Sequence, residues 1–292
     1  MKALIVMNGY PNGEKFYRQS GRIQAELTAL GVQTDVKRNG EITAKLLENG
    51  VIKTTAKDYD FVLYLDKDKY LSRLLEGAGL RVFNSATSIE ICDDKALTYL
   101  ALRNHGVKIP ETIPAPLCYT PNATPSVEFL EEVESLGYPL VAKKSYGSFG
   151  AGVALVKNRA ELEKSEREWL YIPHFYQAFV GKVGRDIRVI VIGGKAVAGM
   201  ARIAKDGEFR SNIELGGRGE KIELSPLYRE TAEKVATALG LDYCGVDLLE
   251  GETPIVCEVN SNAFFEGLES VTGVNIAKRY AEYMLETISK KR

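Results

Sequence analysis

The stretch from Tyr243 to Asn262, YCGVDLLEGETPIVCEVNSN, constrains the fold of this chain more than any other. Two apolar runs flank the turn EGETP, which predicts a β-hairpin. Because side chains alternate along a strand, Glu258 and Asn260 share one face, and Asp247 on the partner strand can face them. Charged side chains among valines, isoleucines and leucines must be paired or must bind a cation. The hairpin therefore predicts a metal-binding face.

The three side chains also indicate which metal this face would hold. Two carboxylates and an amide oxygen are hard ligands suited to Mg²⁺, which completes its shell with water and substrate phosphates. We therefore predict a magnesium site at Asp247, Glu258 and Asn260, with Mn²⁺ as a possible substitute. The alternative is an exposed hairpin edge that carries ordinary acidic residues.

A lysine and several glycines stand together in the segment LVAKKSYGSFGAGV. Glycine lets the backbone approach phosphate oxygens, and a nearby lysine supplies fixed positive charge. Lys143, Gly147 and Gly150 are therefore candidate nucleotide contacts, as is Lys95 at the start of a predicted helix. The segment is not a P-loop, because no GK[ST] follows it. A glycine-rich hairpin and solvated lysines are the alternatives.

Arginines gather in the predicted strands of GRDIRVIVIGGKAVAGMARIAKDGEFRSN. Asp186 and Arg188 share a strand face because they are two residues apart. Guanidinium groups bind carboxylate and phosphate through two parallel hydrogen bonds, so this cluster suits a nucleotide and an anionic substrate. We take Arg188 and Arg210 as the candidate catalytic residues. The alternative is a network of surface salt bridges.

The order of apolar runs predicts an α/β part followed by α+β parts. Up to residue 92, strands and helices alternate, which implies a parallel sheet flanked by helices. The opening NGYPNG lacks the GxGxxG of a dinucleotide-binding fold, and the later passage IPETIPAPLCYTP has the composition of a linker. We expect three domains: an α/β substrate domain over 1–92, a lid domain over 93–172 and a domain with the metal site over 173–292.

Composition argues against several classes of protein. A formal net charge of -1 gives no reason to expect nucleic acid as a partner. With only His105 and His174 in the chain, a zinc site is nearly excluded, and a helix-end contact or packing is the simpler role for each. The cysteines lack CxxC spacing, the N-terminal apolar run is too short for a signal peptide, and no stretch could span a bilayer. We expect a soluble, cytoplasmic protein with no membrane partner.

Taken together, the motifs resemble the RimK-type ATP-grasp ligases, the α-L-glutamate ligase family, which add glutamate to protein termini or small coenzymes. The matching segments, in order, are DDKALTYLALRNHGVKIP, LVAKKSYGSFGAGV, GRDIRVIVIGG, AKDGEFRSNIELGG, LDYCGVDLL, CEVNSN and EGLESVTGVNIA. Their joint order discriminates better than any one of them. The resemblance implies an ATP-grasp fold behind an N-terminal α/β (pre-ATP-grasp) domain, which matches the family only in its pattern.

The resemblance also implies roles for the matching residues. Those near the ATP phosphates would be Lys95, Lys143, Arg210, Ser211 and Asn212. Those at the adenine and the sugar would be Gln177, Ala178 and Asp186. The metal ligands would again be Asp247, Glu258 and Asn260.

The chain departs from the family pattern at two places. Gln177 stands where the family commonly has glutamate, so a charge is missing there. After the metal motif, Asn262, Ala263 and Phe264 replace Ser-Pro-Gly, and the loss of proline and glycine predicts a different path for this loop. Phe264 and Phe265 are then candidates for a wall of the substrate pocket. The alternative is that both rings pack into the core.

The activity that the resemblance implies is that of an ATP-dependent carboxylate-amine ligase, which forms an amide or peptide bond through an acyl phosphate and releases ADP. Phosphoryl transfer gives the carboxylate a good leaving group, while Mg²⁺ and cationic side chains offset the developing charge. The expected partners are a small-molecule or peptide carboxylate and an amine such as glutamate, and a homo-oligomer is compatible with the family. The alternatives are a dipeptide or D-amino-acid ligase and a non-catalytic ATP-binding regulator.

Overall fold

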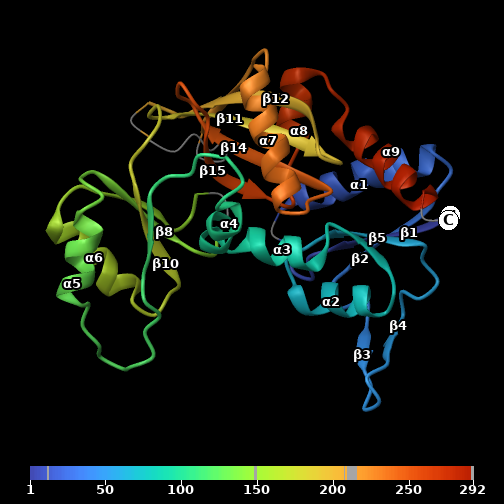
Figure 1. Cartoon of the computed structure of the whole chain (residues 1–292). Coiled ribbons are helices and arrows are strands. Elements are labelled where there is room, and N and C mark those ends of the chain that lie inside the picture. Colours follow the sequence, from blue (N-terminus) through green and yellow to red (C-terminus); the bar gives the residue numbers. More distant parts are fainter. Residues whose placement is uncertain (12, 148–149, 207, 209–215, 291–292) are drawn as a thin grey trace.

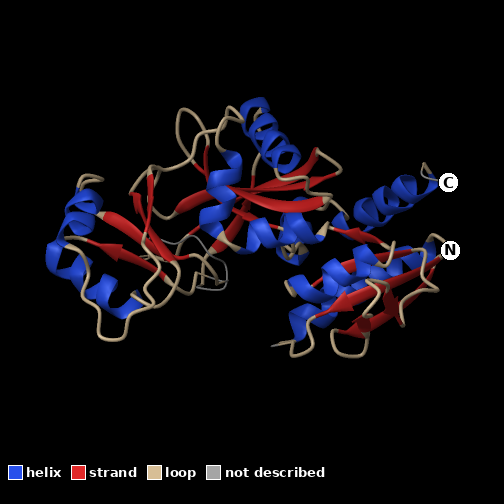
Figure 2. Cartoon of the chain, turned by 60° about the horizontal axis from the view of Figure 1, so that its bottom comes forward, coloured by secondary structure: helices blue, strands red, loops and turns tan. Residues whose placement is uncertain are grey.

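The computed structural model describes the chain except for residues 12, 148–149, 207, 209–215 and 291–292. Within the described residues, the strands form three larger sheets and a two-stranded hairpin. The three sheets follow one another along the molecule, with the C-terminal sheet between the other two (Figures 1 and 2). Ligand sites can therefore form where the C-terminal sheet meets each of the other two sheets.

The N-terminal sheet is parallel, as the alternation of strands and helices predicts. Its strands, in spatial order, are β2 (Gln33–Arg38), β1 (Lys2–Met7), β5 (Phe61–Leu65) and β6 (Arg81–Phe83). The hairpin of β3 (Ala44–Leu46) and β4 (Ile52–Thr54) projects beside it (Figure 1). Because all four strands of the sheet run the same way, their carboxyl ends lie along one edge.

Both faces of the N-terminal sheet are covered, because successive side chains of β1 point to opposite sides. Ala3 and Ile5 join a core cluster that includes side chains of α1 (Glu14–Ala29) and α9 (Ile276–Ser289). Leu4 and Val6 join a second cluster with α2 (Lys69–Gly77) and α3 (Ala86–Asp93). The last helix of the chain thus completes the core of the first domain, and α9 lies along α1 in Figure 1.

The second sheet along the sequence is antiparallel and small. We call it the central sheet for its place in the sequence, although in space the C-terminal sheet lies between it and the N-terminal sheet (Figures 1 and 2). Its strands, in spatial order, are β7 (Thr112–Pro114), β10 (His174–Ala178), β8 (Leu140–Lys144) and β9 (Val153–Val156). The helices α5 (Val127–Glu134) and α6 (Arg159–Trp169) pack on it. By sheet membership, β10 belongs here, beyond the boundary that we expected at residue 172, because it pairs with β7 and β8.

The C-terminal sheet is antiparallel and carries the hairpin with which the sequence analysis began. Its strands, in spatial order, are β13 (Arg218–Lys221), β12 (Lys195–Ile203), β11 (Arg185–Ile192), β14 (Tyr243–Leu249) and β15 (Ile255–Asn260). One face packs against α4 (Lys95–Leu102) and α7 (Pro226–Ala238). The short helix α8 (Glu266–Thr272) follows the loop after β15. None of the described helices is both long and apolar enough to cross a membrane.

A buried asparagine joins the N-terminal sheet to the C-terminal one. Asn84, directly after β6, donates from Nδ2 to the carbonyl oxygens of Tyr243 and Ser261, each at 2.8 Å. Its Oδ1 accepts from the backbone N–H of Tyr243 at 2.9 Å. The residue is 2% exposed, so water cannot replace these bonds. Asn84 therefore fixes the edge of the first domain against the strand that carries Asp247.

Replacing Asn84 by alanine should lower the free energy of unfolding by about 2 to 4 kcal/mol, because three buried backbone groups lose their partners. Chemical denaturation of the parent and of Asn84→Ala measures the change. Asn49→Ala, in the exposed turn of the β3–β4 hairpin, is the matched control and should shift stability by less than about 0.5 kcal/mol. Equal stability of the two variants would contradict the role given to Asn84.

Candidate active site

The polar face predicted for the hairpin extends over four strands of the C-terminal sheet. In the strand register, Asp186 pairs with Arg202, Arg188 pairs with Asp247, and Asp247 pairs with Glu258. Residues paired in register lie on the same face of a sheet, and alternate residues share that face. The opposite face is apolar and belongs to the core under α7. At this end the sheet thus has an apolar face for packing and a polar face, whereas Ile190 and Ile192, further along β11 on the polar face, pack in the core with α9.

Two arginines and two aspartates of this face form a continuous ionic network. Arg188 Nε and Nη2 donate to Asp247 Oδ1 and Oδ2, each at 2.7 Å. Arg202 makes the same fork with Asp186, at 2.7 and 2.6 Å. Arg202 Nη2 also lies 2.8 Å from Asp247 Oδ2, which links the two pairs. The four formal charges cancel, as burial of charge requires.

The network keeps its members ionised although water hardly reaches them. The side chains of Arg202 and Asp247 are 4% and 2% exposed. Burial acts to raise the pKa of Asp247, but the guanidinium groups of Arg188 and Arg202 outweigh burial, and the pKa lies below its usual value. Burial likewise acts to lower the pKa of Arg202, and Asp247 and Asp186 outweigh it, so that pKa is raised. Asp247 is therefore a charged and oriented carboxylate at neutral pH.

The three predicted metal ligands share this face. Glu258 is opposite Asp247 in the register, and Asn260 is two residues further along β15. Glu258 Oε1 lies 3.4 Å from Lys95 Nζ, and its side chain is 26% exposed. No cluster of three His, Cys, Asp or Glu side chains suitable for a metal occurs among the described residues. Two carboxylates with an amide still offer the hard oxygen donors that Mg²⁺ prefers, but a metal ion would have to share Asp247 with its arginines.

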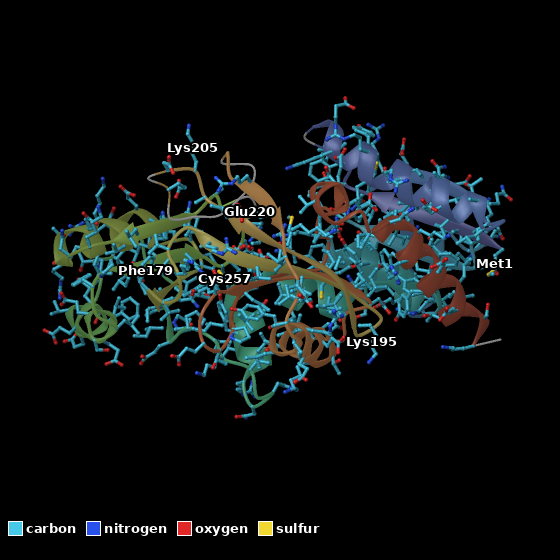
Figure 3. The ribbon with its side chains drawn as sticks, turned by 90° about the horizontal axis from the view of Figure 1, so that it is seen from above. Met1, Phe179, Lys195, Lys205, Glu220 and Cys257 are labelled. Atoms are coloured by element: carbon cyan, nitrogen blue, oxygen red, sulfur yellow. The ribbon has the colours of Figure 1, made fainter. Side chains whose placement is uncertain are left out.

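A cavity lies between the central and C-terminal sheets and encloses about 950 Å³, including its mouth open to solvent. Cavities of this size hold cofactors and other small ligands. Phe179 and Cys257 line this cavity, and Figure 3 labels both on the side of the molecule opposite to Met1. The predicted nucleotide contacts that line it are Lys95, Lys143, Gly147, Gly150, Gln177, Ala178 and Asp186. Three further predicted contacts, Arg210, Ser211 and Asn212, lie outside the described residues.

Two lysines bring positive charge to this cavity. Lys95 Nζ donates to the carbonyl oxygen of Gly147 at 2.7 Å, which ties α4 to the glycine-rich loop. Gly147 has a φ of +141°, a conformation that other residues rarely adopt. Lys143 is 9% exposed, with its Nζ 3.9 Å from Cys257 Sγ. Burial acts to lower the pKa of Lys143, but Cys257, Tyr99 and Glu258 outweigh burial and raise it, so the ammonium persists.

Gln177 leaves one polar atom of the cavity wall without a partner. Its Nε2 donates to Thr112 Oγ1 at 2.8 Å, whereas its buried Oε1 accepts no hydrogen bond from the described residues. A buried acceptor without a donor costs about 1 to 3 kcal/mol. An amino group of a bound ligand would remove this penalty, as the exocyclic amine of adenine can. The geometry thus fits the expected place of the base.

A second cavity lies between the N-terminal and C-terminal sheets and shares Lys95 and Glu258 with the first. Arg188 and Asn260 line it beside Glu258. The three predicted metal ligands therefore lie where the two cavities meet. A ligand in each cavity would therefore have one end at this polar face.

The loop that departs from the family pattern forms part of the second cavity. Phe264 lines it and meets the ring of Phe16 at a centroid distance of 5.2 Å. Phe265 is 2% exposed and packs in the core instead. Phe264 thus lines a cavity, as a wall of a pocket would, whereas Phe265 packs in the core, as the alternative predicted for both rings. Gln19 of α1 holds the loop by donating to Ala263 O at 3.2 Å.

Sequence reasoning missed several residues at these cavities. Arg202 was noted only as one arginine of a cluster, although it joins both aspartates of the network. Cys257 reaches the first cavity at a register shift in β15, which the alternating pattern does not reveal. Asn8 and Asp66 line the second cavity. Their signal was available, since each follows a buried strand of a parallel sheet, where ligands usually bind.

Comparison with known proteins agrees with this geometry. The family model described as the RimK-like ATP-grasp domain matches residues 92–284. Human N-acetylaspartylglutamate synthase A is 32% identical over 231 residues, which cover 78% of this chain and 58% of that protein. A protein of Thioalkalivibrio sulfidiphilus named "probable alpha-L-glutamate ligase" is 37% identical over 216 residues, which cover 73% of this chain and 69% of that protein. The glutamate–LysW ligase ArgX of Sulfurisphaera tokodaii is 32% identical, covering 76% and 78%. The chain thus spans less than two thirds of the human relative.

Solved structures resemble the chain over nearly its whole length. The ATP-grasp ligase PsnB with its minimal precursor gives a TM-score of 0.72 at 20% identity, covering 97% of this chain and 98% of that one. A RimK domain ATP-grasp protein from Sphaerobacter thermophilus gives 0.73 at 19%, covering 96% and 98%. D-alanine–D-alanine ligase from Bacillus anthracis with ATP gives 0.72 at 21%, covering both chains fully. These likenesses confirm the fold. The chain has an ATP-grasp fold and belongs to the RimK-like ATP-grasp family.

Proposed function

We propose that this protein is an ATP-dependent carboxylate-amine ligase that forms an amide or peptide bond and releases ADP and phosphate. The proposal rests on one observation. The face with Asp247, Glu258 and Asn260 lies where the first cavity, which is large enough for a nucleotide, meets the second cavity. A phosphoryl group can pass between two ligands only where their ends meet. The names of the relatives, which join glutamate to an acceptor, agree with this activity.

ATP would occupy the first cavity, with its base at Gln177 and Ala178 and its phosphates toward Lys143 and Lys95. The unsatisfied Gln177 Oε1 supports the position of the base. The two ammonium groups offset the charge of the phosphates, and Gly147 and Gly150 let the loop backbone approach them. A solved PsnB complex that contains magnesium and ADP supports both of these ligands for the fold.

Asp247, Glu258 and Asn260 would hold Mg²⁺, or Mn²⁺ in its place. The cation supplies Lewis-acid stabilisation of the transferring phosphoryl group when bound. The protein contributes the orientation: Arg188 and Arg202 hold the Asp247 carboxylate by both oxygens, and Lys95 approaches Glu258. The charge of the aspartate is therefore in place before any ligand arrives.

Arg188 is the side chain best placed to act on the second substrate, because it lines the second cavity beside Glu258 and Asn260. A carboxylate there would attack the γ-phosphorus of ATP, and ADP would leave. An amine would then attack the acyl carbon and phosphate would leave, while the proton of the amine goes to solvent or to a base. Arg188 can neutralise the oxygens of the acyl phosphate. Glutamate, named in the relatives, is the first amine to test.

A non-catalytic ATP-binding regulator is the weaker candidate. Such a protein would have no need for two carboxylates and an amide grouped beside a second cavity, and this chain groups Asp247, Glu258 and Asn260 there. Incubation with ATP, Mg²⁺ and a mixture of carboxylates and amines distinguishes the two. ADP formed in step with an amide product supports the ligase, whereas ATP binding without any turnover supports the regulator.

Glu258→Gln should reduce ADP formation at least a thousandfold while leaving the melting temperature nearly unchanged, because it removes a charged ligand without changing the shape of the side chain. Turnover is measured at saturating Mg²⁺ by coupled ADP detection. Glu252→Gln, in the exposed turn of the same hairpin, is the matched control and should remain fully active. Near-normal turnover by Glu258→Gln would remove Glu258 from the metal set.

Lys143→Ala should reduce kcat/KM for ATP by roughly thirtyfold to a thousandfold, the scale of about 2 to 4 kcal/mol for one fixed electrostatic donor. Lys157→Ala, on the exposed surface of the same part of the molecule, provides the comparison and should stay within twofold of the parent. A Lys143→Ala protein with parental kinetics would show that this lysine only ends a strand.

A further inference from the structure

The second cavity contains a buried carboxylate that the proposed reaction does not use. Asp66 follows β5 at the carboxyl edge of the N-terminal parallel sheet, and it is 7% exposed. Its Oδ1 accepts from Asn8 Nδ2 at 2.9 Å and from the backbone N–H of Lys67 at 2.7 Å. Its Oδ2 accepts from Asn39 Nδ2 at 3.0 Å. These donors fix its orientation at the edge where ligands of such sheets bind.

The charge of Asp66 has no counter-ion within the described part of the chain. Its hydrogen-bond donors are two side-chain amides and one backbone amide, all of them neutral. The nearest cation in sequence, Lys67, directs its Nζ to Asp93 Oδ1 at 2.7 Å instead. A buried charge is usually balanced by an opposite one. Oδ2, with a single donor, keeps the capacity for a further hydrogen bond.

The other end of the same cavity, at the predicted metal ligands, has a donor that lacks an acceptor in the described part of the chain. Asn260 Nδ2 is buried and finds no acceptor among the described residues. Arg188 and Lys95, both cationic, line the cavity beside it. Arg188 and Lys95 are already paired with Asp247 and Glu258, so this end offers hydrogen-bond donors to an anionic group, whereas the Asp66 end offers a carboxylate to a cationic one.

Between the two ends, the cavity wall is partly apolar. Phe16 of α1 and Phe264 of the loop after β15 line it and contact each other edge to face. Leu65 and Ala263 also contribute to the lining. Measured in the same way as the first cavity, it encloses about 1090 Å³, including its mouth open to solvent. It can therefore hold a carbon skeleton of amino-acid or small-peptide size between its charged ends.

We propose that the second cavity binds a zwitterionic carboxylate substrate, an amino acid or small peptide with a free amino group, and that Asp66 recognises its ammonium. The inference rests on the proposed ligase function. The substrate carboxylate would lie at Arg188 and Asn260, where it becomes phosphorylated, and its ammonium would donate to Asp66. The ammonium then balances the charge of Asp66, and the unsatisfied amide of Asn260 gains an acceptor.

This substrate class differs from those in the names of the human relatives. N-acetylaspartate and citrate, whose names are contained in those of the two synthases, carry no ammonium group and have further carboxylates. A second anion near Asp66 would meet like charge in a buried place, which is unfavourable. Asp66 lies before residue 92, where the match to the family begins, so the family pattern does not determine this residue.

The test pairs free amino acids and dipeptides with their N-acetylated forms as carboxylate substrates, in the presence of ATP, Mg²⁺ and hydroxylamine. Hydroxylamine attacks an acyl phosphate, releases phosphate and leaves a hydroxamate, so activation is read without knowledge of the natural amine. We expect hydroxamate and ADP from the free compounds and at least tenfold less from the acetylated ones. Activation only of acetylated or amine-free carboxylates would overturn the inference and leave the ligase function intact. No hydroxamate and no ADP from any carboxylate would refute the ligase function itself.

Asp66→Asn tests the residue directly, because it preserves shape and removes charge. The KM for the best free-amino substrate should rise by roughly tenfold or more, the scale of one hydrogen bond to a charged group. The KM for ATP should not change, and the preference over the acetylated form should shrink. Asp58→Asn, on the exposed surface of the same domain, should change none of these. An unchanged preference in Asp66→Asn would overturn the assignment, and the comparison of acetylated pairs with the parent decides the substrate class even if this variant does not fold.

Discussion

The ionic network of Asp186, Arg202, Asp247 and Arg188 is the interaction on which the site depends. Its charged groups lie on a sheet whose other face is apolar, and they are stable there only because each carboxylate receives a two-point fork from a guanidinium. The pairing that makes burial tolerable also fixes the direction of each group. The protein therefore has a charged, oriented aspartate in the absence of ligand, and the geometry of the rest of the site follows from it.

The arrangement of the three sheets makes this face useful. The central sheet and the glycine-rich loop close one cavity over it, and the carboxyl edge of the N-terminal sheet closes the other. Lys95 and Glu258 belong to both cavities, so the two ligands would meet at one ion pair. Asn84 holds the N-terminal sheet against β14, which keeps the second cavity in register with the polar face.

The sequence was sufficient to predict the polar face and much of the lining of the first cavity, since strand alternation places Glu258 and Asn260 together and glycine spacing marks the loop. It could not predict that Asp247 is shared by two arginines, because that depends on the register of β11 against both β12 and β14. The register shift that places Cys257 at the first cavity cannot be recognised from the alternation of apolar and polar residues in the sequence. Asp66 had a usable signal in its place after a buried strand of the parallel sheet, but the cavity that it lines forms only where that sheet edge meets the C-terminal domain.

The central claim is that a carboxylate is activated as an acyl phosphate at the junction of the two cavities. The most direct test uses a carboxylate substrate labelled with ¹⁸O in both oxygens and follows the label by mass spectrometry of the phosphate released. Attack of the carboxylate on the γ-phosphorus, followed by attack of the amine at the acyl carbon, transfers one labelled oxygen to each phosphate formed. One ¹⁸O per phosphate, with ADP as the nucleotide product, is the result that we predict. Unlabelled phosphate, or label in AMP, would contradict the account.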